Sequence, residues 1–114
     1  VYFDGFVHKD DWNYERWEGY ETDGLLNYGF EFMDNAGSDP FLLFLSPHPP
    51  HYTPFKFAPD HCYERLPKTL QLPANVPEHL QSASLDMYRH YLAMILAVDD
   101  MLGRFNLLLT KYRQ

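Results

Sequence analysis

The sequence has little of several features that would place it in a broad functional class. Its single cysteine, Cys62, excludes an intramolecular disulfide. Its 9 basic residues against 16 acidic ones give a formal charge of −7, which argues against nucleic acid or an anionic membrane as the main partner. No apolar run approaches the roughly 20 residues of a membrane-spanning helix. The 114 residues, 46% of them hydrophobic, have the size and apolar content of one globular domain.

Aromatic residues are abundant, at 18% of the chain, and many stand among charges in the first 21 residues. Neither a two-residue nor a 3.6-residue period persists there, so we expect an ordered loop whose aromatic side chains pack on another part of the molecule. The polar run from His8 to Asp11 is interpreted as a solvated turn.

Two segments have the apolar spacing of helices. One helix is predicted over about residues 22–35, with the Thr22 hydroxyl as its N-cap and Gly37 suited to a left-handed C-cap. A longer helix is predicted over about residues 84–112, capped by Ser82 or Ser84. Its apolar stripe is expected to comprise Tyr88, Tyr91, Ile95, Val98, Leu102, Phe105 and Leu109.

Two groups of residues in the long helix could bind a metal ion or have a structural role, and we predict a structural role for both. Met87, Met94 and Met101 are expected to fill the core. Asp99 and Asp100 are adjacent, so their side chains point about 100° apart on a helix. We therefore expect this pair to form ion pairs or caps with another element.

Residues 41–46 are predicted to form a buried strand. Phe41 to Leu45 is a run of apolar residues without polar alternation, which is typical of a strand buried on both faces in an α/β sheet. The loop that follows, up to residue 54, holds four prolines and the histidines His48 and His51. Open α/β sheets bind ligands at such strand ends, and imidazoles there can act as acid, base, donor or metal ligand. A solvated proline turn fits the local pattern equally well.

The rest of the middle of the chain offers weaker signals. Residues 55–83 are predicted to form a long connection with one helical turn near residues 60–66, interrupted by prolines. A zinc site of His48, His51, His61 and Cys62 would have an acceptable ligand set. Its spacing is poor, because the adjacent His61 and Cys62 seldom both reach one ion. The sequence therefore predicts no metal ligands.

Four stretches, in order, resemble the formylglycine-dependent type I sulfatases of the alkaline-phosphatase-like superfamily. Residues 19–33 look like the family's Tyr-x-Thr-Asp helix, and residues 40–51 resemble its Pro-Phe-Phe-Leu-x-Leu-Ser…Pro-Pro-His strand and loop. Ala58-Pro59 with residues 72–77 is similar to the Ala-Pro…Leu-Pro-Pro-Asn-Val-Pro connection. Residues 91–104 resemble the helix with Val-Asp-Asp-x-Val-Gly-Arg. The resemblance covers roughly residues 19–114.

The resemblance implies an α/β fragment of an alkaline-phosphatase-like sandwich, with residues 1–114 a single partial domain. His51 matches the family's active-site histidine, which contacts the sulfate ester, and His48 is a candidate substrate-binding neighbour. The family uses Ca²⁺ and formylglycine, but neither set of motifs occurs in this sequence. The chain starts with Val1 rather than Met, which fits a central slice of a longer sulfatase. The rest of the sulfatase domain is then its expected partner, and the isolated chain is expected to be inactive.

Two alternatives remain open at this stage. A phosphodiesterase or phosphonate hydrolase of the same superfamily would carry different metal ligands outside these residues. A small non-enzymatic binding module, holding zinc or docking a partner on the long helix, would be a protein of another class. A sulfate monoester of a sugar or an aryl alcohol is the substrate class that the resemblance implies, with no membrane span and no nucleic acid involved.

Overall fold

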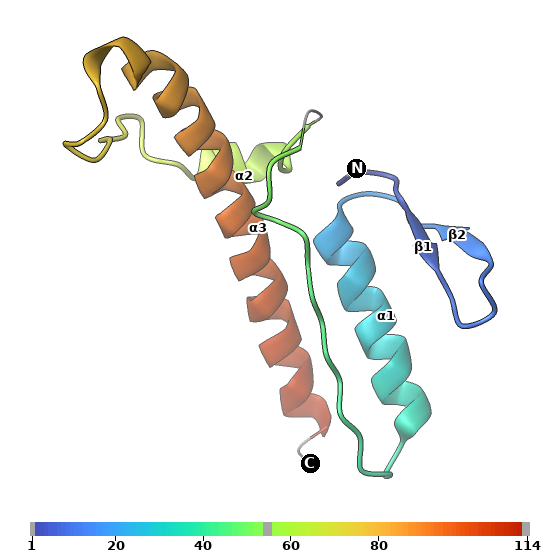
Figure 1. Ribbon diagram of the computed structural model, residues 1–114. Helices are drawn as coiled ribbons and strands as arrows, with labels where there is room; N and C mark the ends of the chain where they lie inside the picture. Colours follow the sequence, from blue (N-terminus) through green and yellow to red (C-terminus); the bar gives the residue numbers. More distant parts are fainter. Residues whose placement is uncertain (1, 54–55, 113–114) are drawn as a thin grey trace.

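A helix of 32 residues, α3 (Gln81–Tyr112), runs along most of the molecule (Figure 1). It is preceded by the hairpin strands β1 (Phe6–His8) and β2 (Tyr14–Arg16), the helices α1 (Glu21–Ala36) and α2 (Asp60–Glu64), and the 3-10 helix η1 (Glu78–Leu80). This computed structural model describes residues 2–53 and 56–112. Residue 54, the last of the predicted proline-rich loop, lies outside the described residues. The fold is thus mixed α/β, with little sheet.

Both predicted helices are confirmed, but their predicted N-caps are wrong. α1 begins at Glu21, so Thr22 lies inside the helix and is buried, and the N-cap residue is Tyr20 without a capping side chain. Tyr20 instead caps through its carbonyl, which accepts the main-chain N–H of Asp23 and of Gly24. Gly37 has the expected positive φ of 58°. The start of α3 at Gln81, directly after η1, places Ser82 and Ser84 within the helix.

The buried face of α3 differs from the predicted stripe. It is made of Ala93, Met94, Ala97 and Met101, whereas Tyr91, Ile95 and Leu102 of the stripe are exposed. Small residues occupy this face because they allow α2 and the N-terminal segment to approach the helix closely. Met94 and Met101 fill the core as expected, but Met87 is 42% exposed, so its assignment to the core is wrong.

The predicted strand over residues 41–46 is not formed. The segment is extended but belongs to neither strand, and Leu42 and Phe44 are 89% and 85% exposed. It runs between α1 and α3 (Figure 1). Leu43 and Leu45 pack on α1, where a methyl group added to Gly29 would lie 3.2 Å from Leu45 Cδ1. A strand needs a partner for its main-chain groups, and no second strand lies beside this segment in the described part of the chain. Only one of its faces is therefore covered.

Residues 3–20 form a hairpin rather than the predicted loop. β1 and β2 pair antiparallel, with Val7 opposite Glu15, and Phe3 forms a further bridge with Tyr20. Of the run predicted to be a solvated turn, Lys9, Asp10 and Asp11 lie exposed in the turn between the strands, whereas His8 ends β1 and pairs with Tyr14. Lys9 pairs with Glu15 at 2.6 Å. The strands are three residues long, too short to establish a readable two-residue period.

The core lies where α2, α3 and the N-terminal segment meet. Its buried members are Tyr2, Tyr20, Ala58, Cys62, Ala93, Met94 and Ala97. The aromatic residues of the N-terminal segment thus pack on the helices, as expected for Tyr2 and Tyr20, whereas Trp12 is 81% exposed. The short helix α2 confirms the helical turn predicted near residues 60–66. This core holds the proline-rich loop beside the start of α1.

The molecule is more open than a compact domain of its length. Its radius of gyration is 17.4 Å, against about 13 Å for a compact domain of this size. Its accessible surface is 8533 Å², against about 6,500 Å² for a folded monomer of its mass. Along the described residues, no helix combines the length and apolar character that crossing a bilayer requires.

Candidate functional site

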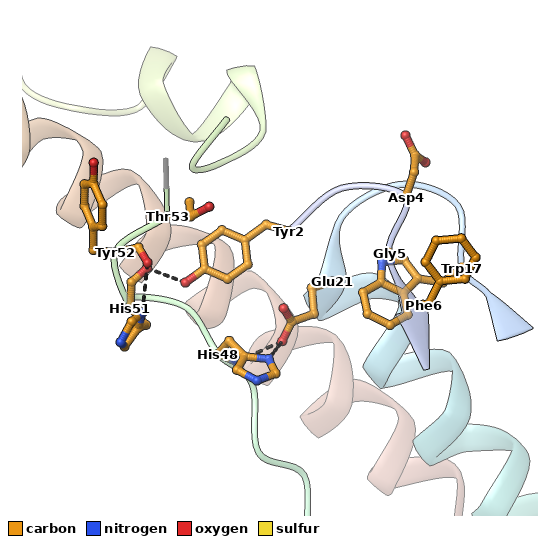
Figure 2. A pocket seen from close by; sticks show the side chains of 10 residues that line it. All are labelled: Tyr2, Asp4, Gly5, Phe6, Trp17, Glu21, His48, His51, Tyr52 and Thr53. Carbon is orange, nitrogen blue, oxygen red and sulfur yellow. Dashed lines mark hydrogen bonds and ion pairs between the residues drawn. The ribbon is translucent and has the colours of Figure 1, made fainter. Parts of the chain in front are cut away.

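A hollow of about 470 Å³ lies between the hairpin, the start of α1 and the proline-rich loop. Both predicted site residues, His48 and His51, line it, and they share it with Tyr2, Glu21 and Trp17 among others (Figure 2). The loop is a tight turn in which the His51 main-chain N–H donates to the His48 carbonyl at 2.9 Å. The turn therefore places the two histidines on one wall.

Glu21 fixes the position of His48. Its Oε1 accepts the main-chain N–H of His48 at 2.9 Å and lies 2.8 Å from the ring Nδ1. Glu21 is buried, with only 7% of its surface exposed, and it occupies the first turn of α1, where the helix dipole favours a negative charge. Because a carboxylate only accepts hydrogen bonds, Nδ1 of His48 carries the hydrogen and Nε2 is left available.

His51 is held in a similar way by the main chain. Its Nδ1 lies 2.8 Å from the carbonyl oxygen of Tyr52. Since a carbonyl oxygen is only an acceptor, Nδ1 of His51 is the donor and Nε2 again keeps the free lone pair. The His51 carbonyl accepts the hydroxyl of Tyr2. Figure 2 shows the Tyr2 hydroxyl directed at this carbonyl and Glu21 directed at the ring of His48.

Burial favours the neutral form of Tyr2. Burial, followed by the negative charge of Glu21, raises the pKa of Tyr2 above its ordinary value. Tyr2 therefore serves as a hydrogen-bond donor to the loop over the whole neutral range. The carboxyl group of Asp4, at the rim, accepts the main-chain N–H of Gly19 at 2.9 Å.

The four-residue zinc set weighed from the sequence is not assembled. His48 and His51 line the hollow, whereas His61 and Cys62 lie on α2 against α3 and are not among its lining residues.

Asp100 forms an ion pair with another element, as predicted, because both of its oxygens lie 2.6 Å from Arg65 Nη1. It thereby links α3 to the end of α2.

Among the lining residues that sequence reasoning missed, Glu21 and Tyr2 make the contacts that hold the two histidines. Glu21 lies 27 positions from His48, and no spacing rule joins them. The one available signal was the acidic first turn of α1, which indicates a helix start rather than a partner for a histidine.

Chemically, the hollow presents two imidazoles with fixed Nδ1–H groups. Each Nε2 can take up a proton, and each protonated ring can donate a hydrogen bond or a proton to an oxygen atom. Such a pair suits an anionic ester, whose bridging oxygen needs a proton as its bond breaks.

Comparison with known protein families gives a match over most of the chain. A family model described as Sulfatase matches residues 2–114. No curated protein and no solved structure matches the chain. The match spans nearly the full sequence, including the hairpin, both long helices and the loop with the two histidines.

Proposed function

Because the chain belongs to the sulfatase family, we propose that it supplies one wall of a site that hydrolyses sulfate monoesters. The observation that carries this proposal is the pair His48 and His51, each with Nδ1 held by an acceptor and both lining one hollow. The family is associated with hydrolysis of such esters, and the pair offers the groups that a sulfate ester requires.

In this proposal His51 contacts the bridging oxygen of the ester. Its Nε2, when protonated, donates the proton that the leaving alcohol needs as the S–O bond breaks. Its ring is kept in place by the Tyr52 carbonyl, and its main chain is kept in place by Tyr2. His48 binds a non-bridging oxygen of the sulfate, and Glu21 acts as a positioning residue that directs Nε2 of His48 away from α1.

The residues that line this hollow do not fit the calcium ion associated with this family. Calcium takes six to eight oxygen ligands. The carboxylates that line the hollow are Asp4 and Glu21, and an oxygen of each is already occupied by main-chain hydrogen bonds. No step of the proposed chemistry passes through calcium at these residues.

The residues around Cys62 do not match the segment from which the family forms formylglycine. The family forms it from the Cys or Ser of a Cys/Ser-x-Pro-x-Arg segment, whereas Cys62 is followed by Tyr63, Glu64 and Arg65. Cys62 is also fully buried against α3. The proposal therefore assigns nucleophile and calcium to the rest of the sulfatase domain, and the 114-residue chain alone is expected not to turn over an aryl sulfate.

The open surface of the chain supports a partner of this kind. Leu42 and Phe44 present an apolar edge of the extended segment that nothing in the described residues covers. An extended apolar segment with unpaired main-chain groups is a ready template for a further strand. We assign this edge to the sheet of the remaining sulfatase domain.

The hollow can be tested on the chain itself by following its histidine ring nitrogens by NMR while p-nitrophenyl sulfate is added. The Nε2 signals of His48 and His51 should shift saturably, and those of His79, which lies on η1 outside the hollow, should not. p-Nitrophenol, which lacks the sulfate, is the matched control ligand. Equal shifts at His79, or the same shifts with p-nitrophenol, would count against the proposal.

A further inference from the structure

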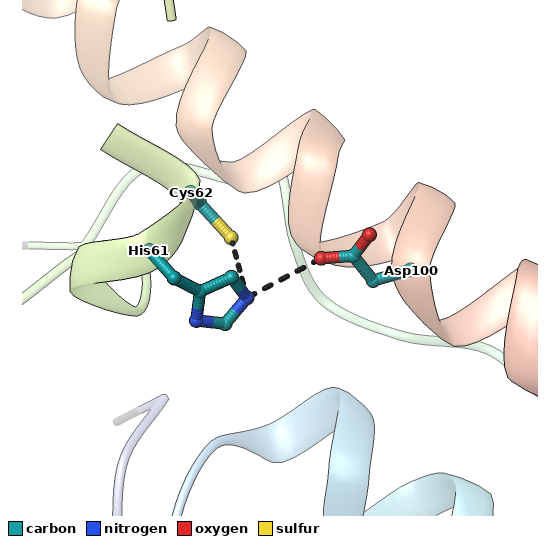
Figure 3. A group of neighbouring side chains, drawn as sticks. All are labelled: His61, Cys62 and Asp100. Atoms are coloured by element: carbon teal, nitrogen blue, oxygen red, sulfur yellow. Dashed lines mark hydrogen bonds and ion pairs between the residues drawn. The ribbon is translucent and has the colours of Figure 1, made fainter. Parts of the chain in front are cut away.

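A second cluster of ligating side chains lies between α2 and α3 (Figure 3). His61 Nε2 is 3.4 Å from Cys62 Sγ and 3.3 Å from Asp100 Oδ2. The three ligand atoms all lie within 4.8 Å of one another. Figure 3 shows the imidazole directed between the thiol and the carboxylate.

The two separations from His61 Nε2, to Cys62 Sγ and to Asp100 Oδ2, match a tetrahedral zinc ion. Zinc binds histidine nitrogen and carboxylate oxygen at about 2.0–2.2 Å and cysteine sulfur at about 2.3 Å, so the ligands of one ion lie roughly 3.3–3.7 Å apart. We propose that His61, Cys62 and Asp100 form a zinc site that ties α2 to α3. The site is independent of the proposed sulfatase function.

Two of the three ligands, His61 and Asp100, also line a second hollow. This hollow, of about 490 Å³, is lined by His61 and by the carboxylates of Asp23, Asp99 and Asp100. Its three carboxylates outnumber the guanidinium of Arg104, which lines the same hollow and pairs with Asp23, so the net charge favours a divalent cation. From this side an ion can reach the half-exposed Asp100 and the exposed His61. Water fills the fourth position, as in zinc sites with three protein ligands.

Arg65 supports the proposed site by holding the carboxylate of Asp100, without binding the ion itself. Its Nη1 lies 2.6 Å from both oxygens of Asp100. Ligating carboxylates are commonly held by such outer hydrogen bonds. When the ion binds, Oδ2 of Asp100 turns to the metal and Oδ1 keeps Arg65. The Cys62 thiol releases its proton to solvent, so thiolate and carboxylate together balance the two charges of Zn²⁺.

The ligand types distinguish this site from the calcium site associated with the family. Calcium takes oxygen ligands, whereas a thiolate with an imidazole favours zinc or cobalt. The cluster also shares no lining residue with the hollow of His48 and His51. The sequence argument against zinc rested on the adjacency of His61 and Cys62, and the structure shows that the ring and the thiol of these neighbours converge.

The test uses Co²⁺ added to the reduced chain in the presence of excess Ca²⁺. We expect one Co²⁺ per chain with a sulfur-to-cobalt charge-transfer band, and displacement of the band by one equivalent of Zn²⁺. His61→Ala should lose stoichiometric binding; its side chain is 61% exposed, so the fold survives. Cys62→Ser should lose the band. Asp99→Asn, an exposed neighbour in the same hollow, should bind as wild type does.

Three results would overturn the zinc site. These are no charge-transfer band with the wild-type chain, undiminished binding by His61→Ala, or full displacement by Ca²⁺. In each of these cases His61, Arg65 and Asp100 form only an ion-pair link between the helices. Circular dichroism of His61→Ala, expected to match wild type, excludes unfolding as the cause of a lost signal.

Discussion

Oε1 of Glu21 binds both the main-chain N–H and the ring Nδ1 of His48, at 2.9 and 2.8 Å. One buried carboxylate oxygen at the start of α1 thus fixes the loop and the ring orientation together. The ring itself remains 78% exposed, so its Nε2 is available to a ligand. This arrangement converts a histidine on a proline turn into a positioned functional group.

Glu21→Gln should allow the ring of His48 to adopt both neutral tautomers. The amide that replaces the carboxylate can donate or accept, so Nδ1 of His48 no longer has to carry the hydrogen. Long-range ¹H–¹⁵N NMR of the ring should show a single Nδ1–H tautomer in wild type and a mixture in the variant. Glu18→Gln, an exposed site on the same segment, is the control and should leave the wild-type pattern. An unchanged spectrum for Glu21→Gln would contradict the positioning role.

Met94→Ala should destabilise the chain by about 2–5 kcal/mol, because it empties a buried site of α3 that is 2% exposed. The matched substitution Met87→Ala, on the same helix but 42% exposed, should change stability by less than about 0.5 kcal/mol. Urea denaturation of both variants measures the difference. Equal losses would mean that the buried face of α3 is misplaced.

Gly5→Ala should also be destabilising, by about 1–3 kcal/mol. A Cβ atom at Gly5 would lie 2.9 Å from Trp17 Cη2 and closer still to Cζ2, so the indole ring must move. Gly103→Ala is the matched opposite: nothing lies within 4 Å of its Cβ position on α3. Alanine there favours the helix by up to about 1 kcal/mol. Thermal melts should move the two variants in opposite directions.

Tyr20→Phe should make stability less sensitive to alkali. Burial, followed by the charges of Tyr2 and Glu21, raises the pKa of Tyr20. The unfolded chain ionises this group near pH 10, so its contribution to stability is complete below that pH and is lost as the pH rises further. In the variant, loss of the hydrogen bond to the Phe57 carbonyl lowers stability at pH 8, but stability should then fall less between pH 8 and pH 11 than in wild type. A loss between these two pH values as large as in wild type would refute the assignment.

Helix positions could be predicted from the sequence, because 16 and 32 residues give several turns of apolar spacing. The hairpin could not, since strands of three residues show no period. The predicted strand over residues 41–46 failed for a different reason. An apolar run predicts that a segment will be buried. A strand also needs a partner strand, and the presence of a partner cannot be predicted from the run alone.

The candidate site, too, could be predicted only in part from the sequence. Proline spacing and the position after an apolar run singled out His48 and His51, and the structure brings both to one hollow. Their supports, Glu21 and Tyr2, are contributed by distant parts of the chain through tertiary contacts. For α3, bulky side chains suggested the buried face, whereas close packing selected Ala93 and Ala97.

We propose that His51 acts on a sulfate ester within the sulfatase domain to which this chain contributes. The most direct measurement is kcat for an aryl sulfate with the intact protein that carries this chain, comparing wild type with His51→Ala and with His79→Ala as the surface control. The proposal predicts a fall in kcat of about 10²–10⁴-fold for His51→Ala, an unchanged fold, and wild-type activity for His79→Ala. Wild-type kcat in folded His51→Ala, or an intact protein without sulfatase activity, would contradict it.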